Sequence, residues 1–216
     1  MSLRILVVDD HAVVRRGVRS LLESHEGWEV CGEATTGRDA VEQSRRLRPD
    51  VVVMDLSLPE LNGLDATRQI LKDAPNTEVL VLTMHHSEEL ARDALQAGAR
   101  GYVLKSDADE NLITAVDSLR RHKPFLTSAV TEFVLDDYVR RGDAALDDVA
   151  PVAVTARERE IIQLVAEGRS NKEAASTLGI SVKTIEAHRA NIMRKLHLRS
   201  VSDLVRYAIR NKIVQP

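Results

Sequence analysis

Over residues 3–121, short apolar runs alternate with stretches whose apolar positions recur at helical spacing. The apolar runs predict strands buried on both faces, and the stretches between them predict helices. The expected strands are 3–10, 28–34, 50–55, 78–83 and 101–105, and the expected helices are 11–24, 38–47, 63–72, 88–97 and 109–121. This alternation predicts an α/β fold, a doubly wound five-stranded parallel sheet with right-handed crossovers and strand order 2-1-3-4-5.

From residue 154 onward, only the helical period remains. Thr155 and Glu158 form a capping-box pattern that predicts a first helix, which Gly168 closes. Ser170 begins a second helix that ends near Leu178, and Ser181 begins a longer third helix that ends near residue 196. A fourth helix is expected from Ser200 or Ser202 to about residue 211. A short helix, a turn and a longer helix are typical of a helix-turn-helix.

The pattern therefore predicts two domains, residues 1–121 and residues 151–216, joined by a linker over 122–150. Within the linker, Thr127 or Ser128 is expected to cap a helix that runs to residue 140. The stretch that follows, from residue 141 to residue 151, is rich in Asp, Ala and Gly and is too polar to bury. We therefore interpret it as a tether. The alternative is that the 128–140 helix docks on one domain and transmits a signal.

Composition separates the two halves. Residues 1–150 contain 18 Lys and Arg against 27 Asp and Glu, a net charge of −9, whereas residues 151–216 contain 12 against 6, a net charge of +6. The basic second half suggests a polyanionic partner. The chain contains no apolar run of about 18 residues that could span a membrane and no signal-peptide pattern at its start, so we expect a cytoplasmic protein. Its single cysteine, Cys31, excludes internal disulfides.

Chemically active groups stand at the strand ends. The first strand ends on Asp9 and Asp10, the third on Asp55, the fourth on Thr83 and the fifth on Lys105. In a parallel sheet these ends share one edge, and the crevice between strands one and three is the expected ligand site. A lone strand-end Asp55 could merely cap a turn, but the five groups together indicate a reaction centre.

The five groups suit a phosphorylatable aspartate. Three carboxylates repel one another unless a hard divalent cation lies among them, and Mg²⁺ with oxygen ligands fits such a site. Asp55 would then be the nucleophile, with Lys105 pairing the phosphoryl oxygens and Thr83 donating a hydrogen bond. The structural alternative for Lys105 is a salt bridge to Asp55, and in the resting protein both can hold.

With these residues in place, 1–121 resembles the receiver domain of two-component response regulators. Leu58-Pro59 and Asn62-Gly63 match the loop that follows the family's acceptor. The resemblance implies that Mg²⁺ is bound directly by Asp10, Asp55 and the backbone carbonyl of Ser57, and by Asp9 through water. It also makes Tyr102 the switch aromatic that turns inward when Thr83 moves, although Tyr102 could instead be a half-buried strand aromatic.

Ser57 and His85 each lie two residues beyond a predicted site residue, Asp55 and Thr83. There, their side chains could crowd or orient the water that attacks the phosphoryl group. We therefore expect them to set the lifetime of the phosphorylated state. The alternative, that His85 is an ordinary loop histidine, is slightly favoured by the sequence.

The third helix of the second half has two distinct faces. On a helical wheel, Val182, Ile185, Ile192 and Leu196 form the buried side, and the outward residues are Lys183, Ala187, Ala190, Asn191 and Arg194. A face that is small and basic can approach a major groove closely. In this picture Ala187 touches a thymine methyl, and Lys183 and Arg194 reach phosphates or guanine. Glu186 could accept from a cytosine amine or simply be solvated.

Residues 154–211 resemble the LuxR-type four-helix domain of the NarL/FixJ subfamily. The resemblance rests on Arg157-Glu158-Arg159-Glu160, Gly168, Ser170-Asn171-Lys172-Glu173, Ile180-Ser181, Thr184-Ile185-Glu186-Ala187-His188 and Asn191-Ile192. It implies that Lys183, Thr184, Ala187 and His188 lie at or near DNA. Arg189 falls along the apolar stripe, so we expect it to pair internally with Glu158 or Glu160.

The sequence thus predicts a transcription factor controlled by phosphorylation of Asp55 by a sensor histidine kinase. Its partners would be the kinase, double-stranded DNA and a second copy of the chain, because one helix in one groove reads too few bases. One alternative is an enzyme, a phosphatase or phosphotransferase acting through Asp55, but the second acid that such enzymes usually carry two residues on is replaced by Ser57. A protein-binding adaptor without DNA affinity is the other alternative.

Overall fold

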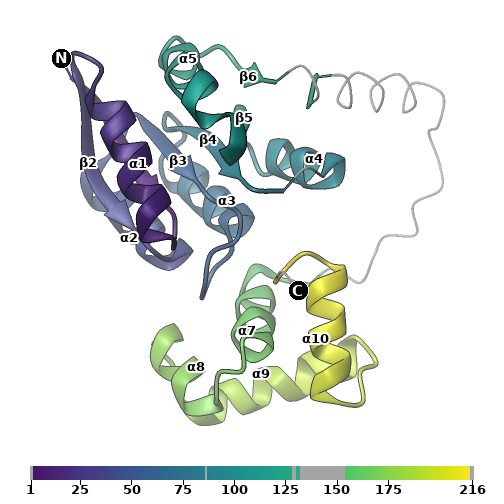
Figure 1. Cartoon of the computed structure of the whole chain (residues 1–216). Helices are drawn as coiled ribbons and strands as arrows, with labels where there is room; N and C mark the ends of the chain where they lie inside the picture. The colour runs from purple at the N-terminus through teal and green to yellow at the C-terminus, as the bar shows by residue number, and fades with distance from the viewer. Residues whose placement is uncertain (1, 86, 128–129, 132–153, 215–216) are drawn as a thin grey trace. The chain divides into compact units, whose positions relative to one another are not determined.

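The computed structural model describes residues 2–85, 87–127, 130–131 and 154–214. The chain divides into two compact units, one built on a sheet and one built of helices, and each is treated by itself (Figure 1). The predicted helix at 128–140 and the tether up to residue 150 fall almost entirely outside the described residues, and the predicted domain boundaries stay predictions. Within the described part of the chain, no helix is long and apolar enough to cross a membrane.

The first unit alternates strands and helices as the pattern predicted. Its strands are β1 (Leu3–Val8), β2 (Trp28–Ala34), β3 (Val51–Met54), β4 (Glu78–Thr83), β5 (Gly101–Leu104) and β6 (Phe125–Leu126). Its helices are α1 (Ala12–Glu23), α2 (Gly37–Leu47), α3 (Gly63–Asp73), α4 (Glu88–Gln96) and α5 (Ala108–Arg120), with a short 3₁₀ turn η1 (Lys105–Asp107) before α5. Thr36 and Ser87 cap α2 and α4 through their side chains, which fixes where these helices begin.

The sheet confirms the predicted order and adds one strand to it. The strands pair in parallel in the order β2-β1-β3-β4-β5-β6. The prediction of five strands was therefore one short, because β6 contributes only Phe125 and Leu126 at the edge, paired with Gly101 and Tyr102. The register places Val8 opposite Met54 and Met54 opposite Val81. Strands β1 and β3 consequently end at the same level, and β4 continues two residues further, to Thr83.

Both faces of the sheet are covered, as expected for a doubly wound fold (Figure 1). One face packs against α1 and α5 in a cluster that includes Ile5, Val53, Leu80, Leu22 and Leu112. Alternate strand residues point to the other face, where Leu6, Val52, Val81 and their neighbours are also fully buried. A sheet enclosed on both sides presents its polar chemistry at the strand ends.

The second unit contains α7 (Ala156–Ala166), α8 (Asn171–Leu178), α9 (Val182–Lys195) and α10 (Val201–Arg210), as Figure 1 shows. The four predicted caps are in place. Thr155 and Ser170 form capping boxes with Glu158 and Glu173, while Ser181 and Ser200 accept backbone N–H groups at the starts of α9 and α10. Gly179 ends α8 in the left-handed conformation, at a φ of 63°.

One apolar cluster joins the four helices, and it tests the predicted faces of α9. Ile185 and Ile192 are fully buried in the cluster, and Leu196 is half-buried against it. The prediction for Val182 was wrong, because its side chain is 40% exposed. Val182 is the first residue of α9, and a wheel carries no information about how far a packing partner extends along the helix axis.

Candidate functional site

The structure gathers acidic groups at the carboxyl edge of the sheet. Asp9 and Asp10 directly follow β1, and Asp55 directly follows β3, the neighbouring strand. Asp55 N–H donates to the carbonyl of Val8 at 2.9 Å, so the two strand exits are bonded to each other. Thr83, the last residue of β4, is fully buried at the same edge. The topology therefore places the predicted residues together, as the strand order required.

Lys105 binds two of the three carboxylates. Its Nζ lies 2.8 Å from Oδ2 of Asp55 and 2.7 Å from Oδ2 of Asp9. Asp9 and Asp55 are 3% and 2% exposed, so the three groups form a buried charge cluster with net charge −1 when all are ionised. The structural salt bridge foreseen for Lys105 is present, and it includes Asp9 as well as Asp55.

Burial and charge oppose each other in this cluster. Burial raises the pKa of the Asp55 carboxyl, and the repulsion of Asp9 adds to this, while the hydrogen bond and charge of Lys105 act in the opposite direction without cancelling the rise. For Lys105, burial alone would lower the pKa, but the hydrogen bonds to Asp55 and Asp9 outweigh it and the pKa is raised. The ammonium is thus kept charged, and this one ammonium faces two carboxyl groups.

A metal ion fits this imbalance. Asp9, Asp10, His11 and Asp55 each offer a ligand atom within 4.8 Å of the others. Oxygen donors predominate in this group, as hard divalent cations require. A cation would also counter the repulsion of Asp9, which adds to the burial that raises the pKa of Asp55. The chain can therefore hold a metal at this edge. His11 was not among the predicted residues, and its Nδ1 lies 2.8 Å from Oδ1 of Asp10.

The loop after β3 fixes the position of Asp55. The Leu56 N–H donates to Oδ1 of Asp55 at 2.7 Å, so the two carboxylate oxygens have separate partners. Gly63 passes so close that an added Cβ would lie 2.0 Å from the carbonyl oxygen of Asp55. Any larger residue at position 63 would displace the backbone that carries the carboxylate. This contact explains why a glycine stands at position 63, beside the site.

A hydrogen-bonded chain of side chains and backbone joins the predicted switch and tuning residues. Ser57 Oγ and His85 Nε2 are 3.1 Å apart, and His85 N–H donates to Thr83 Oγ1 at 3.3 Å. The Tyr102 hydroxyl donates to the His85 carbonyl at 2.9 Å. Tyr102 is only 1% exposed, so the description of a half-buried aromatic was wrong, and burial raises its pKa to about 12. His85 is thus hydrogen-bonded to Ser57, Thr83 and Tyr102.

In the second unit, α9 presents a continuous exposed face. Lys183, Ala187, Ala190, Asn191 and Arg194 are all exposed, as are Thr184 and Glu186, while His188 is half-buried. Thr184 Oγ1 lies 2.8 Å from the capping hydroxyl of Ser181, and Arg194 donates to Oδ1 of Asn191 at 2.8 Å. All eight residues predicted for DNA contact lie on this helix, and seven of them are exposed.

Two polar contacts fix α9 against the other helices. Arg189 donates to Oδ1 of Asn171, the first residue of α8. Lys195, in the last turn of α9, binds Glu158 at 2.7 Å, and Glu160 is bound by Arg157 at 2.8 Å. Arg189 is internal as expected, but the partner predicted for it was wrong. The helical period indicated the side of α9 that faces inward, whereas the partner depends on how α8 crosses it.

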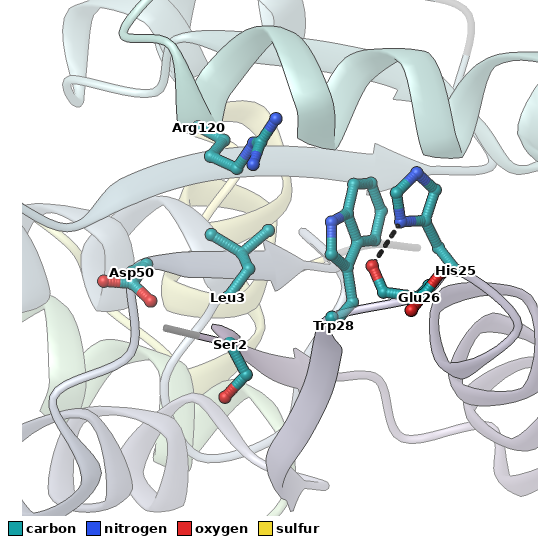
Figure 2. Close-up of a pocket in the computed structure, with 8 residues that line it drawn as sticks. Ser2, Leu3, His25, Glu26, Trp28, Asp50 and Arg120 are labelled. Atoms are coloured by element: carbon teal, nitrogen blue, oxygen red, sulfur yellow. Dashed lines mark hydrogen bonds between the residues drawn. The ribbon is translucent and has the colours of Figure 1, made fainter.

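A pocket of about 280 Å³ lies at the opposite, amino edge of the sheet (Figure 2). Leu3 and Trp28, which begin β1 and β2, line it together with Asp50, His25 and Arg120. Its polar groups are already engaged, since Asp50 accepts the N–H of Arg4 at 2.8 Å and Arg120 donates to Asp117 at 2.9 Å. The His25 ring stacks on Trp28. The pocket takes no part in the acidic site.

Comparison with known proteins matches two families to two separate parts of the chain. Residues 5–117 match the family described as response regulator receiver domain, and residues 152–208 match the family described as bacterial regulatory proteins, luxR family. The oxygen regulatory protein NreC of Staphylococcus carnosus is 40% identical over 215 residues, covering 98% of this chain and 99% of that protein.

Solved structures give the same result. A LuxR-family two-component response regulator from Aurantimonas sp. SI85-9A1 is 35% identical, with a TM-score of 0.61 over 64% of this chain and 99% of its own. A structure of two RcsB dimers bound to two parallel DNAs is 27% identical, with a TM-score of 0.59 over 96% of this chain and 98% of its own.

An acidic strand-edge site on a doubly wound sheet, followed by a helix-turn-helix unit, defines a response regulator that acts on DNA. The chain belongs to the two-component response regulators that carry a receiver domain and a LuxR-type helix-turn-helix domain. It is accordingly a DNA-binding transcription regulator and not an enzyme of phosphate metabolism.

Proposed function

We propose that a sensor histidine kinase controls this regulator by transferring a phosphoryl group to Asp55. In the transfer, a carboxylate oxygen of Asp55 forms a bond to phosphorus as the phosphorus–nitrogen bond to the kinase histidine breaks. The observation that carries the proposal is the buried cluster in which Asp55 lies 2.8 Å from Lys105, beside Asp9 and Asp10. Phosphoryl transfer requires mainly positioning and charge neutralisation, and these groups supply both.

Each residue of the cluster has a separate role in the transfer. Asp10, Asp55 and the Ser57 carbonyl would hold Mg²⁺ directly and Asp9 through water, and the bound ion would neutralise the charge of the transferring group. Lys105 pairs with a phosphoryl oxygen in place of the Asp55 carboxylate. Thr83 donates its hydroxyl to another oxygen. Because His85 N–H binds the Thr83 hydroxyl and Tyr102 binds the His85 carbonyl, a movement of Thr83 is passed to Tyr102 through one residue.

The Ser57–His85 pair is expected to control how long the phosphoryl group survives. The hydrogen bond between the two side chains, 3.1 Å long, joins the loops that follow β3 and β4. Replacing either residue by alanine removes this hydrogen bond and lets water into the space between the loops. We therefore expect the half-life of phosphorylated Asp55 to fall about 3- to 10-fold, which corresponds to the free energy of one hydrogen bond. The double variant should lose no more than the worse single variant.

The measurement is the decay of phosphorylated protein after removal of the phosphodonor. His122→Ala is a suitable control, because His122 is bonded to Glu78 at the amino end of β4, away from Asp55. Its decay should match that of the wild type. If both Ser57→Ala and His85→Ala decay at the wild-type rate, the pair has no part in setting the lifetime.

We further propose that α9 enters the major groove of double-stranded DNA. The residues assigned to the contact are Lys183, Thr184, Glu186, Ala187, His188, Ala190, Asn191 and Arg194. Support comes from the exposed, small and basic face of the helix and from its fixed attachment through Arg189 and Lys195. RcsB, a structural relative, binds DNA as dimers, and we propose a homodimer on DNA here as well, since two half-sites supply enough base contacts.

Incubation with acetyl phosphate and Mg²⁺ tests the whole proposal. We expect a stable adduct of one phosphoryl group, mapped to Asp55 by mass spectrometry, and a concomitant increase in DNA affinity measured by footprinting. Multiple turnover on organic phosphates would instead indicate an enzyme. A complete lack of DNA affinity at every salt concentration would indicate a protein-binding adaptor, because phosphate contacts require affinity to rise as salt falls.

A further inference from the structure

Arg15 connects the acidic loop to strand β2. It lies on α1, and its Nη1 donates to the backbone carbonyl of Asp9 at 2.8 Å. Its Nε donates to Oε2 of Glu33, on β2, at 2.9 Å. The Arg15 side chain is only 16% exposed. One guanidinium therefore joins the Asp9 carbonyl to Glu33, which lies 18 residues beyond Arg15 in the chain.

The bond to Asp9 bears on the metal site because it holds the peptide group between Asp9 and Asp10. The N–H of Asp9 donates to the carbonyl of Ala34 at 3.1 Å, so the backbone of Asp9 is bound on both sides. Its carboxylate is bound by Lys105 and by the N–H of His11. Asp9 is thus fixed at four points, and the peptide that leads to Asp10 has a single orientation.

Asp10 depends on that orientation. Its carboxylate is 36% exposed and contacts the solvent-exposed imidazole of His11. The contact with His11 holds the Asp10 carboxylate only at the surface. The direction in which this carboxylate points is therefore set mainly by the backbone of Asp10. A rotation of the 9–10 peptide would move the Asp10 carboxylate out of the group of ligand atoms that lie within 4.8 Å of one another.

Glu33 is itself a firm anchor. Its other oxygen, Oε1, accepts from Nη1 of Arg19 at 2.9 Å, so each carboxylate oxygen has its own arginine. Burial alone would raise the pKa of Glu33, but the hydrogen bonds from Arg19 and Arg15 outweigh it and the pKa is lowered. Glu33 consequently stays ionised at neutral pH and keeps Arg15 in place.

We propose that Arg15, held by Glu33, is a positioning residue for the metal site: it orients the Asp9–Asp10 peptide so that Asp10 points at the divalent cation. This inference rests on the proposed function, in which Asp10 ligates Mg²⁺. The rigid fork of arginine suits the task, since Nε and Nη1 bind different groups at fixed separation, whereas a lysine offers a single point charge. Partners that orient metal ligands typically contribute about 10- to 100-fold to metal affinity.

The test measures metal binding by the unphosphorylated full-length protein. Mn²⁺ serves as the probe through the loss of its free-ion electron paramagnetic resonance signal, and Mg²⁺ is measured by competition. We expect Arg15→Gln and Arg15→Lys each to weaken both ions about 10-fold. Glu33→Gln should weaken them less, because the amide still accepts a hydrogen bond from Arg15. Circular dichroism and thermal unfolding confirm that each variant is folded.

Arg19→Gln is the matched control. Arg19 carries the same charge on the same helix and binds the same Glu33, but its second partner is Glu23, whereas that of Arg15 is the Asp9 carbonyl. We expect Arg19→Gln to leave metal affinity within about twofold of the wild type. An equal loss in Arg15→Gln and Arg19→Gln would assign the effect to Glu33 or to α1 in general, and would overturn the assignment to Arg15.

The sign of the effect separates positioning from simple charge. If Arg15 acted only as a positive charge beside the acidic loop, Arg15→Gln would bind the cation more tightly and Arg15→Lys would bind it as the wild type does. Either of these results overturns the proposal. Wild-type protein that binds neither Mn²⁺ nor Mg²⁺ would instead contradict the metal site of the proposed function.

Phosphorylation by acetyl phosphate gives a second readout. We expect Arg15→Gln to need about 10-fold more Mg²⁺ for half-maximal rate, with a maximal rate at saturating Mg²⁺ close to that of the wild type. A lower maximal rate with an unchanged Mg²⁺ requirement would place Arg15 in the transfer step and would overturn the positioning role.

Discussion

Asp55→Asn is expected to remove phosphorylation by acetyl phosphate and by the kinase, with a loss of at least about 10³-fold. The amide has nearly the shape of the carboxylate, but it lacks the nucleophilic oxygen that forms the bond to phosphorus. Incorporation of radioactive phosphate and intact-protein mass measure the first effect. The phosphorylation-dependent gain in DNA affinity should be lost as well, and a binding assay with and without phosphodonor measures this second effect.

The fold should survive this substitution. The asparagine Oδ1 can still accept from Lys105 or from the Leu56 N–H, and the change removes a buried charge that lies close to Asp9. Burial and Asp9 both raise the pKa of Asp55, so ionisation of this carboxyl at neutral pH does not stabilise the folded state. We therefore expect the melting temperature of Asp55→Asn to be no lower than that of the wild type.

Asp50→Asn is the control that matches this substitution most closely. Asp50 and Asp55 flank the same strand, β3, at its two ends. Asp50 accepts the N–H of Arg4 at the amino edge, a bond that an asparagine oxygen can retain. We expect full phosphorylation of Asp50→Asn. Kinase-dependent activation of Asp55→Asn at the wild-type level would refute the assignment of the phosphoacceptor.

The acidic site was predictable because of how a parallel sheet is built. The ends of parallel strands meet at one edge whatever the details of packing, so Asp9, Asp55, Thr83 and Lys105 could be placed together from their positions alone. The helix caps at Thr155, Ser170, Ser181 and Ser200 were predictable for a similar reason. Each depends on a hydrogen bond to a residue three positions along the chain.

Contacts between distant elements were not predictable in this way. Arg15 reads as an ordinary helix arginine, since its partner Glu33 is 18 residues away on β2. Arg189 was placed on the correct side of α9 but with the wrong partner, because Asn171 meets it only through the crossing of α8 and α9. The edge strand β6 has two residues and leaves no pattern. Each of these features depends on tertiary geometry.

The same limit applies to the tuning of the site. The spacing of Ser57 and His85 from Asp55 and Thr83 identifies two positions but not a bond between them. The structure supplies the bond, and it shows that the His85 backbone also binds Thr83 and Tyr102. A residue that the sequence alone favoured slightly as an ordinary loop histidine therefore lies at the centre of the proposed switch.

Removing the two outward cations of α9 is expected to have the largest effect on DNA binding. Lys183 and Arg194 stand near opposite ends of the helix, and both are exposed. We expect the Lys183→Ala/Arg194→Ala double variant to bind its operator roughly 100-fold more weakly at moderate salt, about 10-fold for each contact. If both contact phosphates, the slope of log K against log salt should become shallower by about two.

The matched control removes the same charge from a different helix. Arg206 and Arg210 are exposed on α10, so Arg206→Ala/Arg210→Ala lowers the net charge of the unit equally without touching α9. If α9 lies in the groove, this control retains most of the affinity and nearly the whole salt slope. Equal losses in the two double variants would mean that the unit attracts DNA only through its overall charge, and α9 would lose its assignment as the reading helix.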